Sequence, residues 1–375
     1  MTAASQPVQR PPDAKLLVVD ADGEIVQARR STLVDYLRRG DLVIANDAAT
    51  LPASLAGVHL RTGAPIEVRL AGRRSLEVDA VRYFAAIVFG EGDFHTPTER
   101  RPAPPPLEPG DRLHLGPLSA TIVRLLDHPR FAWLRFNGSP SDIWEGLAHH
   151  GRPIQYAHLV DPLALWDVWT PIAGPPAAFE APSAGFSLDW RSLATMKRRG
   201  ISFATITHAA GISSTGDAAL DARLPFDEPY LIPRATAIAV RRAKANGRRV
   251  VAVGTTVVRA LEHAASPRGF VREGPGIATQ RIGATTQLRV VDAMISGVHE
   301  PGTSHYELLR AFVDEVTLRR VGAELEASGY RTHEFGDSVL LERQARVPEA
   351  ADAPSPKSSA KACRYCAAPA PMLSL

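Results

Sequence analysis

The sequence predicts an α/β domain that is interrupted by a small all-β domain, and three observations support this prediction. Short apolar runs alternate with helical spacing near the start of the chain and again after Pro153, which is typical of a parallel sheet with covering helices. Between these parts, strand-like runs follow one another closely, which indicates a small barrel or sandwich. A continuous apolar strand also leads into a Gly-Thr-Thr turn and a helix within residues 250–262.

The change in sequence pattern along the chain predicts the domain boundaries. Residues 1–53 and 154–343 form the two parts of the α/β main domain, and residues 54–153 form the inserted all-β domain. Residues 344–375 are rich in Ala, Pro and Ser and lack periodicity, so we expect a disordered tail there.

Composition indicates the class of protein and its compartment. The chain has 375 residues, of which 45% are hydrophobic and 22% charged, as in a globular protein large enough for two domains. No apolar run approaches the roughly 20 residues of a membrane helix, and residues 1–13 lack a signal-peptide core, so we expect a cytoplasmic protein. Cys363 and Cys366 form half of a zinc site without a second pair. We interpret them as a tail feature, with metal or redox use as the alternative.

The basic residues are mostly arginine. The net charge is +3, and only five of the 43 basic residues are lysine. Most of the arginine clusters are typical of solvated helix ends, because the helix dipole favours basic residues in the last turn. Gly200 and Gly247 follow two of the clusters as helix-termination signals. Since arginine suits bidentate contacts with phosphate, a basic patch for nucleic acid is the alternative.

The first 53 residues predict a hairpin, a short helix and a buried strand. The expected elements are strands at 16–20, 24–30 and 41–45 and a helix at 31–39. The last of these strands ends in Asn46 and Asp47. Open α/β sheets and α/β barrels bind ligands at the carboxyl ends of their strands, so these two residues are candidates for a site.

The remaining elements follow from the same patterns. In the inserted domain, strands are expected at 58–60, 66–70, 78–89, 112–115, 120–126 and 131–136. In the second part of the main domain, helices are expected at 189–199 and 234–246, and strands at 201–207 and 249–253.

The turn at Gly254, Thr255 and Thr256 is the most informative local feature. Glycine permits the close approach of a ligand, and the N-terminus of the following helix favours negative charge. The turn therefore suits a small anionic or hydroxyl-rich ligand. An ordinary connection between a strand and a helix is the alternative.

Three later segments also carry polar groups. A strand is expected at 289–292, ending in a carboxylate, and His299 precedes a helix at 306–313 that Thr303 or Ser304 can cap. The segment 330–338 contains a Gly-Asp turn before an apolar run. A histidine in an irregular loop more often has a structural role, so these segments point to chemistry only if they converge.

In order along the chain, these segments resemble one enzyme family. The motifs are residues 40–47 with Leu51-Pro52-Ala53, residues 181–185, residues 253–262, Val290-Val291-Asp292 with His299 and Pro301, and Tyr330 with Phe335-Gly336-Asp337. Their order and spacing between Leu16 and Leu341 are similar to those of the S-adenosylmethionine:tRNA ribosyltransferase-isomerase family. The resemblance implies a barrel-like α/β main domain with an inserted small β-barrel.

The resemblance also implies a reaction in queuosine synthesis. The ribosyl part of S-adenosylmethionine is transferred to 7-aminomethyl-7-deazaguanine in tRNA and isomerised to epoxyqueuosine, and adenine and methionine are released. S-adenosylmethionine is then a co-substrate and tRNA a partner. We expect no metal, because the sulfonium is already an activated leaving group and no metal-ligand cluster stands out in the sequence. A monomer is favoured.

This chemistry needs a base beside the sulfonium, a proton donor for adenine, and donors for the methionine carboxylate. The candidates for base or hydroxyl ligand are Asp47, Glu262 and Asp292, and those for proton transfer are His208 and His299. The candidates for binding S-adenosylmethionine are Asn46, Gly254, Thr255, Thr256, Arg259 and Asp337. As structural alternatives, Asp47 and Asp292 cap neighbouring elements, and Glu262 pairs with Arg259 on a helix surface.

The sequence departs from the family pattern at several polar positions. Ser54 stands in place of an arginine, Phe226 in place of a histidine and Gly297 in place of an asparagine, and the loops at 208–214 and 283–286 differ from the family motifs. Two hypotheses follow. The chain is either the transferase with a remodelled site, or a diverged relative that binds S-adenosylmethionine, a nucleoside or tRNA without this reaction.

Overall fold

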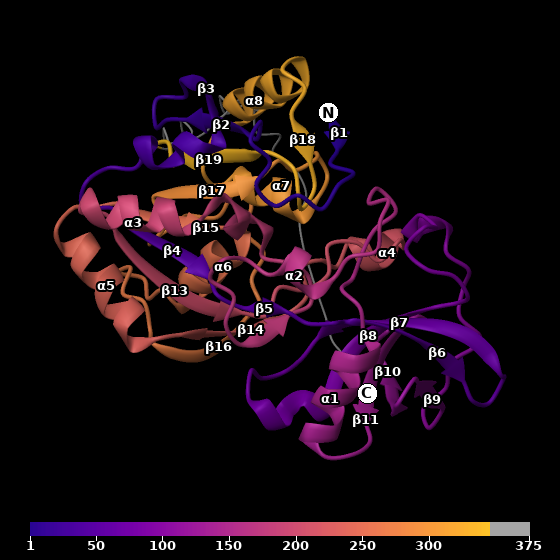
Figure 1. The fold of residues 1–375 in the computed structure, drawn as a ribbon. Helices are drawn as coiled ribbons and strands as arrows, with labels where there is room; N and C mark the ends of the chain where they lie inside the picture. Colours follow the sequence, from indigo (N-terminus) through magenta and orange to yellow (C-terminus); the bar gives the residue numbers. More distant parts are fainter. Residues whose placement is uncertain (346–375) are drawn as a thin grey trace, which may run out of the picture. The chain divides into compact units, whose positions relative to one another are not determined.

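The computed structural model describes residues 1–345 (Figure 1). Cys363, Cys366 and nearly all of the predicted tail lie outside these residues. Within residues 1–345, no helix combines the length and the apolar character needed to cross a bilayer.

A nine-stranded mixed sheet forms the main domain (Figure 1). Across the sheet, the strands are β16 (Gly274–Ala278), β14 (Glu228–Ile232), β13 (Ser202–His208), β4 (Leu42–Asn46), β15 (Val250–Val253), β17 (Ala293–Gly297), β19 (Ser338–Glu342), β2 (Lys15–Val19) and β3 (Ile25–Arg29). Strands β13, β4, β15 and β17 are parallel, so their carboxyl ends share one edge of the sheet. Two short parallel pairs lie outside it, β1 (Thr2–Ala3) with β18 (Arg331–Thr332) and β5 (Ala49–Thr50) with β12 (Pro176–Ala178).

Both faces of the central strands are buried, which explains their unbroken apolar sequences. In β4, Leu42 and Ile44 pack in one hydrophobic cluster, whereas Val43 and Ala45 pack in another. Successive side chains of a strand point to opposite faces, so a strand without polar alternation needs cover on both sides. Helices α5 (Arg234–Ala245) and α6 (Thr255–Ala264) contribute to the first cluster. Helix α3 (Trp190–Arg198) and the 3-10 helix η1 (Arg30–Tyr36) contribute to the second.

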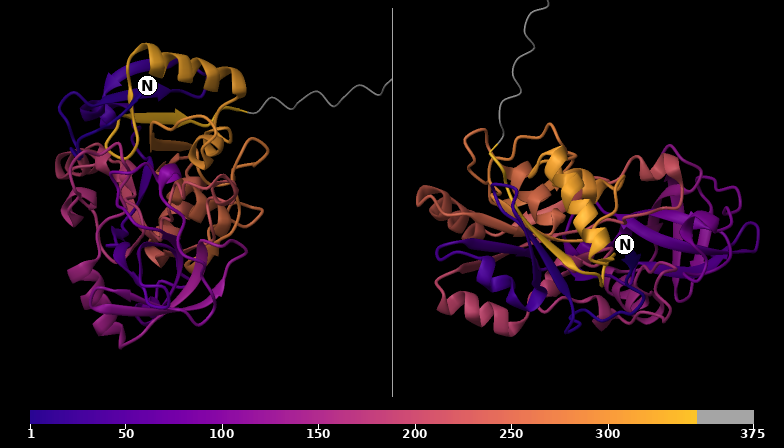
Figure 2. Two further views of the ribbon diagram at one scale, coloured as in Figure 1. Left: turned by 90° about the vertical axis from the view of Figure 1, so that its right-hand side faces the viewer. Right: turned by 90° about the horizontal axis from the view of Figure 1, so that it is seen from above.

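The remaining helices lie at the ends of the sheet and in the connections. Helix α8 (Glu315–Ala327) packs its apolar side against the outer strands β2 and β19, along which it lies in Figure 2. The others are α1 (Pro140–His150), α2 (Leu165–Val168), α4 (Ala218–Asp221), α7 (Ser304–Leu309), η2 (Val78–Arg82), η3 (Thr98–Arg100) and η4 (Ser183–Ser187). Helix α7 begins at Thr303, whose side chain accepts a hydrogen bond from the Tyr306 N–H, as predicted.

The inserted domain is a closed six-stranded antiparallel barrel. Its strands are β6 (Ser54–His59), β7 (Ala64–Gly72), β8 (Tyr83–Phe89), β9 (Arg112–Leu115), β10 (Leu118–Leu125) and β11 (Phe131–Phe136). The predicted α/β fold with an inserted small β-barrel is thus confirmed. Phe179, Ala209 and Ile212 of the main domain belong to the hydrophobic core of the barrel. Since Ala209 follows β13 directly, the barrel packs beside the carboxyl edge of the sheet.

Several local predictions were wrong. The sheet is mixed rather than parallel, because β14, β3 and the β19–β2 pair introduce antiparallel neighbours. A short apolar strand does not encode its direction, so its sequence could not reveal this. Residues 289–292 do not form a strand, because the Glu262 carboxylate accepts the N–H groups of residues 289, 290 and 291. The helix predicted at 31–39 is the 3-10 helix η1.

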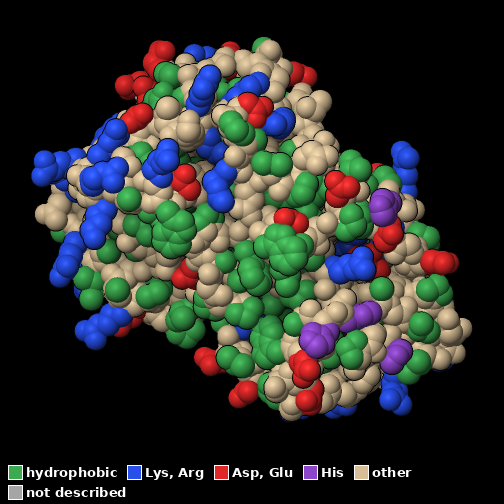
Figure 3. Space-filling view, viewed as in Figure 1, with side chains coloured by type: hydrophobic (Ala, Val, Ile, Leu, Met, Phe, Trp, Pro, Cys, Tyr) green, Lys and Arg blue, Asp and Glu red, His purple; other side chains and the backbone are tan. Residues whose placement is uncertain are grey.

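Many basic residues lie at helix ends, as predicted. Lys197 and Arg198 occupy the last turn of α3, and Arg242 and Lys244 occupy the last turn of α5. Figure 3 shows Lys and Arg side chains gathered over this side of the main domain. Their placement fits the negative end of each helix dipole, which needs no ligand to explain it.

A buried ion cluster inside the barrel gives a test of stability. Glu67 pairs with Arg69 and Arg101, and all three side chains are buried. Ser54 donates a hydrogen bond of 2.7 Å to the same carboxylate. We expect Glu67→Ala to lower the free energy of unfolding by about 3–5 kcal/mol, because it leaves two buried guanidinium groups without their carboxylate.

Urea unfolding followed by circular dichroism measures this change. The control is Glu91→Ala, which removes an exposed carboxylate from the same domain and should change stability by less than about 0.5 kcal/mol. Equal effects of the two substitutions would show that the ion cluster does not stabilise the barrel.

Candidate active site

Asn46 joins the ends of two neighbouring strands. Its side-chain oxygen accepts hydrogen bonds from the Ala48 and His208 N–H groups, at 3.1 and 2.9 Å. Its side-chain nitrogen donates to the His208 carbonyl at 2.9 Å and to the Thr256 hydroxyl at 3.4 Å. The buried amide therefore brings together three of the predicted residues, Asn46, His208 and Thr256, at the carboxyl edge of the sheet.

The Gly254 turn forms the adjacent part of this edge. Gly254 has a φ of +97°, a conformation that favours glycine, and its N–H donates to the Ile295 carbonyl of β17 at 2.8 Å. Helix α6 begins at Thr255, so its N-terminus and two threonine side chains lie at the end of β15. Binding of an anionic or hydroxylated group at this turn stays a prediction.

Asp47 lies beside Asn46 at the same edge. Its carboxylate accepts a hydrogen bond of 2.7 Å from the Thr207 hydroxyl of β13. The side chain is partly exposed, and it forms no ion pair among the described residues. Asp47 is therefore available to a ligand at the carboxyl edge.

A buried charge cluster supports this edge from within. Glu228 lies next to Arg259, whose guanidinium also donates to the carbonyls of Phe226 and Ala278. His208 Nε2 lies 3.2 Å from the Glu228 carboxylate, and the Gly211 N–H donates to it at 2.7 Å. Burial by itself raises the pKa of Glu228, but the charge of Arg259 and the contact with His208 outweigh burial and hold that pKa at about 2.

Arg259 therefore has a partner other than the two that were expected, a bound ligand and Glu262. Its guanidinium is used by Glu228 and by backbone carbonyls, so it supports the site from the interior. It does not pair with Glu262, which instead binds backbone N–H groups of residues 289–291.

His299 and His305 form a stacked pair after β17. Their ring centroids are 4.8 Å apart, and His299 Nε2 lies 2.8 Å from the Ser296 hydroxyl. Burial, followed by the nearby His305 and His333, lowers the pKa of His299 well below its ordinary value. Burial also lowers the pKa of His305. Both imidazoles are consequently neutral near pH 7.

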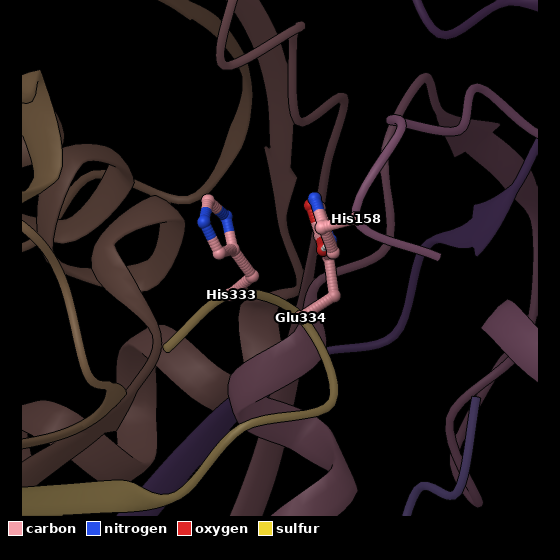
Figure 4. Close-up of side chains that lie close together, drawn as sticks. All are labelled: His158, His333 and Glu334. Carbon is pink, nitrogen blue, oxygen red and sulfur yellow. Dashed lines mark hydrogen bonds and ion pairs between the residues drawn. The ribbon is translucent and has the colours of Figure 1, made fainter. Parts of the chain in front are cut away.

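A second group of polar side chains faces the same region from two loops. His158 and His333 stack with ring centroids 4.2 Å apart, and His158 Nε2 lies 3.2 Å from the Glu334 carboxylate (Figure 4). His158 and His333 line an open cleft of about 410 Å³ together with Tyr156, Ser213 and Ser214.

Glu180 is the protonatable acid of this region. Tyr156 donates a hydrogen bond to its carboxylate, and the Ser213 N–H donates to the same oxygen at 3.0 Å. Burial, reinforced by the negative charge of Glu334, raises the pKa of Glu180 to about 7. The carboxyl group is thus divided between its protonated and ionised forms at neutral pH.

Two of the predicted site residues, Asp292 and Glu262, lie away from these side chains. A third, Asp337, lies at the carboxyl edge, but its carboxylate binds backbone N–H groups. The Asp292 carboxylate contacts Lys244, Arg343 and the N–H at the start of β15, which places it at the opposite edge of the sheet. Glu262 caps the backbone of residues 289–291. Asp337 is at the carboxyl edge, but its buried carboxylate accepts the N–H groups of Lys15 and Arg331. The alternative interpretation of Asp292, that it caps a neighbouring element, therefore describes its contacts.

Sequence reasoning missed several polar groups of the site. They are Tyr156, His158, Glu180, Glu228, His305, His333 and Glu334. Two signals were present, since His333 and Glu334 lie within the polar segment 330–338 and Glu180 directly precedes the motif at 181–185. His158 carried no such signal, because only the tertiary fold brings its loop to the cleft, and His305 lies in the first turn of α7 directly after the polar segment that begins at His299.

The site combines a neutral base with a partly protonated acid. The low pKa of His299 leaves an imidazole able to accept a proton, and the raised pKa of Glu180 leaves a carboxyl group able to donate one. Both groups interact electrostatically with the loop that carries His333 and Glu334. Next to them, the N-terminus of α6 can stabilise negative charge. The arrangement suits proton transfer around a ligand that carries an anionic group.

The fold and this edge define the class of protein: an α/β protein with an inserted β-barrel and with buried titratable groups near the carboxyl ends of its parallel strands. The chain belongs to the family of queuosine biosynthesis proteins, whose family model matches residues 1–341.

The similarity to known proteins covers nearly the whole chain. The S-adenosylmethionine:tRNA ribosyltransferase-isomerase of Gloeobacter violaceus is 32% identical over 343 residues, which cover 90% of this chain and 92% of that protein. The protein of the same name from Sorangium cellulosum is also 32% identical, with 90% and 94% covered. The crystal structure of the S-adenosylmethionine tRNA ribosyltransferase from Thermotoga maritima is similar with a TM-score of 0.48 and 23% identity, covering 90% of this chain and 95% of that one.

The raised pKa of Glu180 gives a test by pH. The folded state holds this proton up to about pH 7, whereas an unfolded glutamate loses it near pH 4.5. The contribution of Glu180 to stability is therefore fully present below pH 4.5 and is lost as the pH rises toward 7. Relative to Glu180→Gln, we expect the wild type to lose up to about 3 kcal/mol between pH 4.5 and pH 8.

Urea unfolding of both proteins at pH 4.5, 6 and 8 measures this difference. The exposed Glu77→Gln serves as the matched control and should follow the wild type at every pH. A wild-type minus Glu180→Gln difference that does not change with pH would contradict the raised pKa.

Proposed function

We propose that the chain is an S-adenosylmethionine:tRNA ribosyltransferase-isomerase that forms epoxyqueuosine in tRNA. The observation that carries this proposal is the similarity to proteins of that name along nine-tenths of the chain. The reaction transfers the ribosyl part of S-adenosylmethionine to 7-aminomethyl-7-deazaguanine and releases adenine and methionine. We place the reaction in the cytoplasm and expect a monomeric enzyme.

The carboxyl edge supplies groups for each demand of this reaction. We assign the N-terminus of α6, with Thr255 and Thr256, to the methionine carboxylate or the ribose hydroxyls. The neutral imidazole of His299 and the carboxylate of Asp47 are the candidate bases for the proton beside the sulfonium. Glu180 is the candidate donor to the departing adenine, because it retains a proton near pH 7. The sulfonium leaves without help from a Lewis acid, so this route needs no metal.

An arginine-rich groove supports the assignment of tRNA as the partner. The groove has a volume of about 570 Å³ and lies where the barrel meets β16, and its lining includes Arg73, Arg74, Arg124, Trp133, Arg223, Phe226, Asp227 and Arg281. Arg74 lies over the Trp133 ring at 4.9 Å, and Phe131 stacks on Phe226 at 4.7 Å. Among the described residues, these five arginines form no ion pair. Arg73, Arg223 and Arg281 each donate to a backbone carbonyl. Guanidinium groups without a carboxylate partner beside aromatic rings suit the phosphates and unstacked bases of an RNA loop.

The groove also lies close in sequence to the buried charge cluster that contains Glu228. Phe226 and Asp227 line the groove and directly precede Glu228, which contacts His208 and Arg259. A nucleotide held in the groove would therefore lie near the carboxyl edge. The groove is our candidate for the nucleic-acid-binding basic patch that the arginine clusters suggest.

Release of adenine tests the proposed reaction directly. We expect the purified protein to release adenine from S-adenosylmethionine only with tRNA that carries the 7-aminomethyl base. Asp47→Ala and His299→Ala should each reduce this rate by at least about 100-fold while circular dichroism remains unchanged, because each removes a candidate proton acceptor.

The matched control is Asp22→Ala, in the exposed turn between β2 and β3, which should retain the full rate. Retained S-adenosylmethionine binding without adenine release by the wild type would instead favour a diverged binding protein. An unchanged rate in either site variant would remove that residue from the mechanism.

Salt dependence tests the groove. We expect Arg124→Ala to weaken tRNA binding and to reduce the slope of log affinity against log salt by about one, because one phosphate contact is lost. S-adenosylmethionine binding should not change. The control is Arg319→Ala on the exposed side of α8, which should leave tRNA affinity and slope unchanged. Equal effects of the two variants would mean that general charge, rather than the groove, attracts tRNA.

A further inference from the structure

Three side chains of types that commonly bind metal ions lie close together at the cleft beside the site. One ligand atom from each of His158, His333 and Glu334 lies within 4.8 Å of the other two. His158 comes from the loop after α1, whereas His333 and Glu334 are adjacent in the loop before β19 (Figure 4). No spacing motif in the sequence indicates this group, because about 175 residues separate its two parts.

The distance between two of the donor atoms matches that of a coordination shell. His158 Nε2 and a Glu334 oxygen are 3.2 Å apart. Two donor atoms that each lie about 2.1 Å from one ion, at an angle near 100°, are separated by roughly this distance. The His158 and His333 rings are 22° from parallel with centroids 4.2 Å apart, so binding one ion through both rings requires the His333 ring to turn out of this stack.

The loop that carries two of these residues has an unusual backbone. His333 has a φ of +68°, a left-handed conformation that is costly for a residue with a side chain. The loop is fixed on both sides, since the Gly336 carbonyl accepts from Arg30 and the Asp337 carboxylate accepts the Arg331 N–H. The strained position is therefore held by the surrounding structure, and it presents His333 and Glu334 together to His158.

A further carboxylate lies behind His333. The nearest Glu300 oxygen is 3.9 Å from His333 Nε2, and the Thr332 hydroxyl lies 3.4 Å from the same oxygen. Metal-bound histidines commonly have a carboxylate or carbonyl partner that orients the ring. Glu300 is placed to act as such a partner after a small shift.

We propose that His158, His333 and Glu334 form a binding site for a divalent transition-metal ion of the zinc class. Two imidazoles and one carboxylate favour such ions over Mg²⁺ or Ca²⁺, which prefer oxygen ligands. Three protein ligands leave further coordination positions for a small ligand, and two of the three residues, His158 and His333, line the cleft. The site goes beyond the proposed function, whose chemistry needs no metal, and an ion there would fix the loop before β19 against the loop after α1.

Zinc titration of the full chain tests this site. Cys363 and Cys366 are first replaced by serine, so that thiolates cannot bind the added ion. Calorimetry of the metal-stripped protein with ZnCl₂ should give one site per chain, and Co²⁺ should give a visible spectrum without thiolate bands. His158→Ala and His333→Ala should each weaken Zn²⁺ binding by at least about tenfold.

The matched control is His95→Ala, which removes an exposed histidine that also lies beside a carboxylate, that of Asp93 at 2.9 Å. It should bind Zn²⁺ as the parent does. If an alanine variant unfolds, Glu334→Gln retains the shape of the loop and should still weaken binding. Absence of Zn²⁺ binding, or binding that none of the three site variants weakens, would overturn the proposal. The readout is independent of adenine release, so its failure is distinguishable from failure of the proposed reaction.

Discussion

The amide of Asn46 is the constraint on which the site depends. Three of its four hydrogen bonds join the end of β4 to the end of β13 and to the first turn of α6, and the fourth is local, from the Ala48 N–H. A carboxamide presents two donors and an acceptor with two lone pairs in one plane, which neither a carboxylate nor an apolar side chain can reproduce. Because the group is buried, each unmade bond would carry a desolvation cost. The relative positions of His208 and Thr256 thus follow from one side chain.

The Glu228 and Arg259 pair extends this constraint into the interior. Both charges are buried, and their mutual attraction compensates for desolvation only because further donors and carbonyls complete their contacts. Gly211 contributes through its lack of a side chain, since a Cβ there would lie 2.7 Å from the Glu228 carboxylate. The pair links β14, α6 and the strand end at His208, so residues that first resembled ligand contacts instead fix the geometry of the site.

The sequence predicted those features that local patterns encode. Alternating apolar runs predicted the α/β fold, and the rule for strand ends correctly placed Asn46, Asp47 and Gly254 at one edge. The same rule failed for Asp292, because the apolar run before it is held by Glu262 and the strand begins after it. Strand direction and the meeting of His158 with His333 depend on tertiary packing, which leaves no periodic signal in either loop.

The two edges of the sheet use their charged groups differently. At the amino edge, Arg249 pairs with Asp41 and Glu342, and Asp292 pairs with Lys244 and Arg343, so each of these charges has an opposite charge beside it. At the carboxyl edge, burial acts on His299 and Glu180 without an opposite charge sufficient to balance it. Burial disfavours the charged form of either group, so it lowers the pKa of the histidine and raises that of the acid. Burial therefore keeps the His299 imidazole neutral and leaves the Glu180 carboxyl group partly protonated near pH 7, the two states that the proposed proton transfers require.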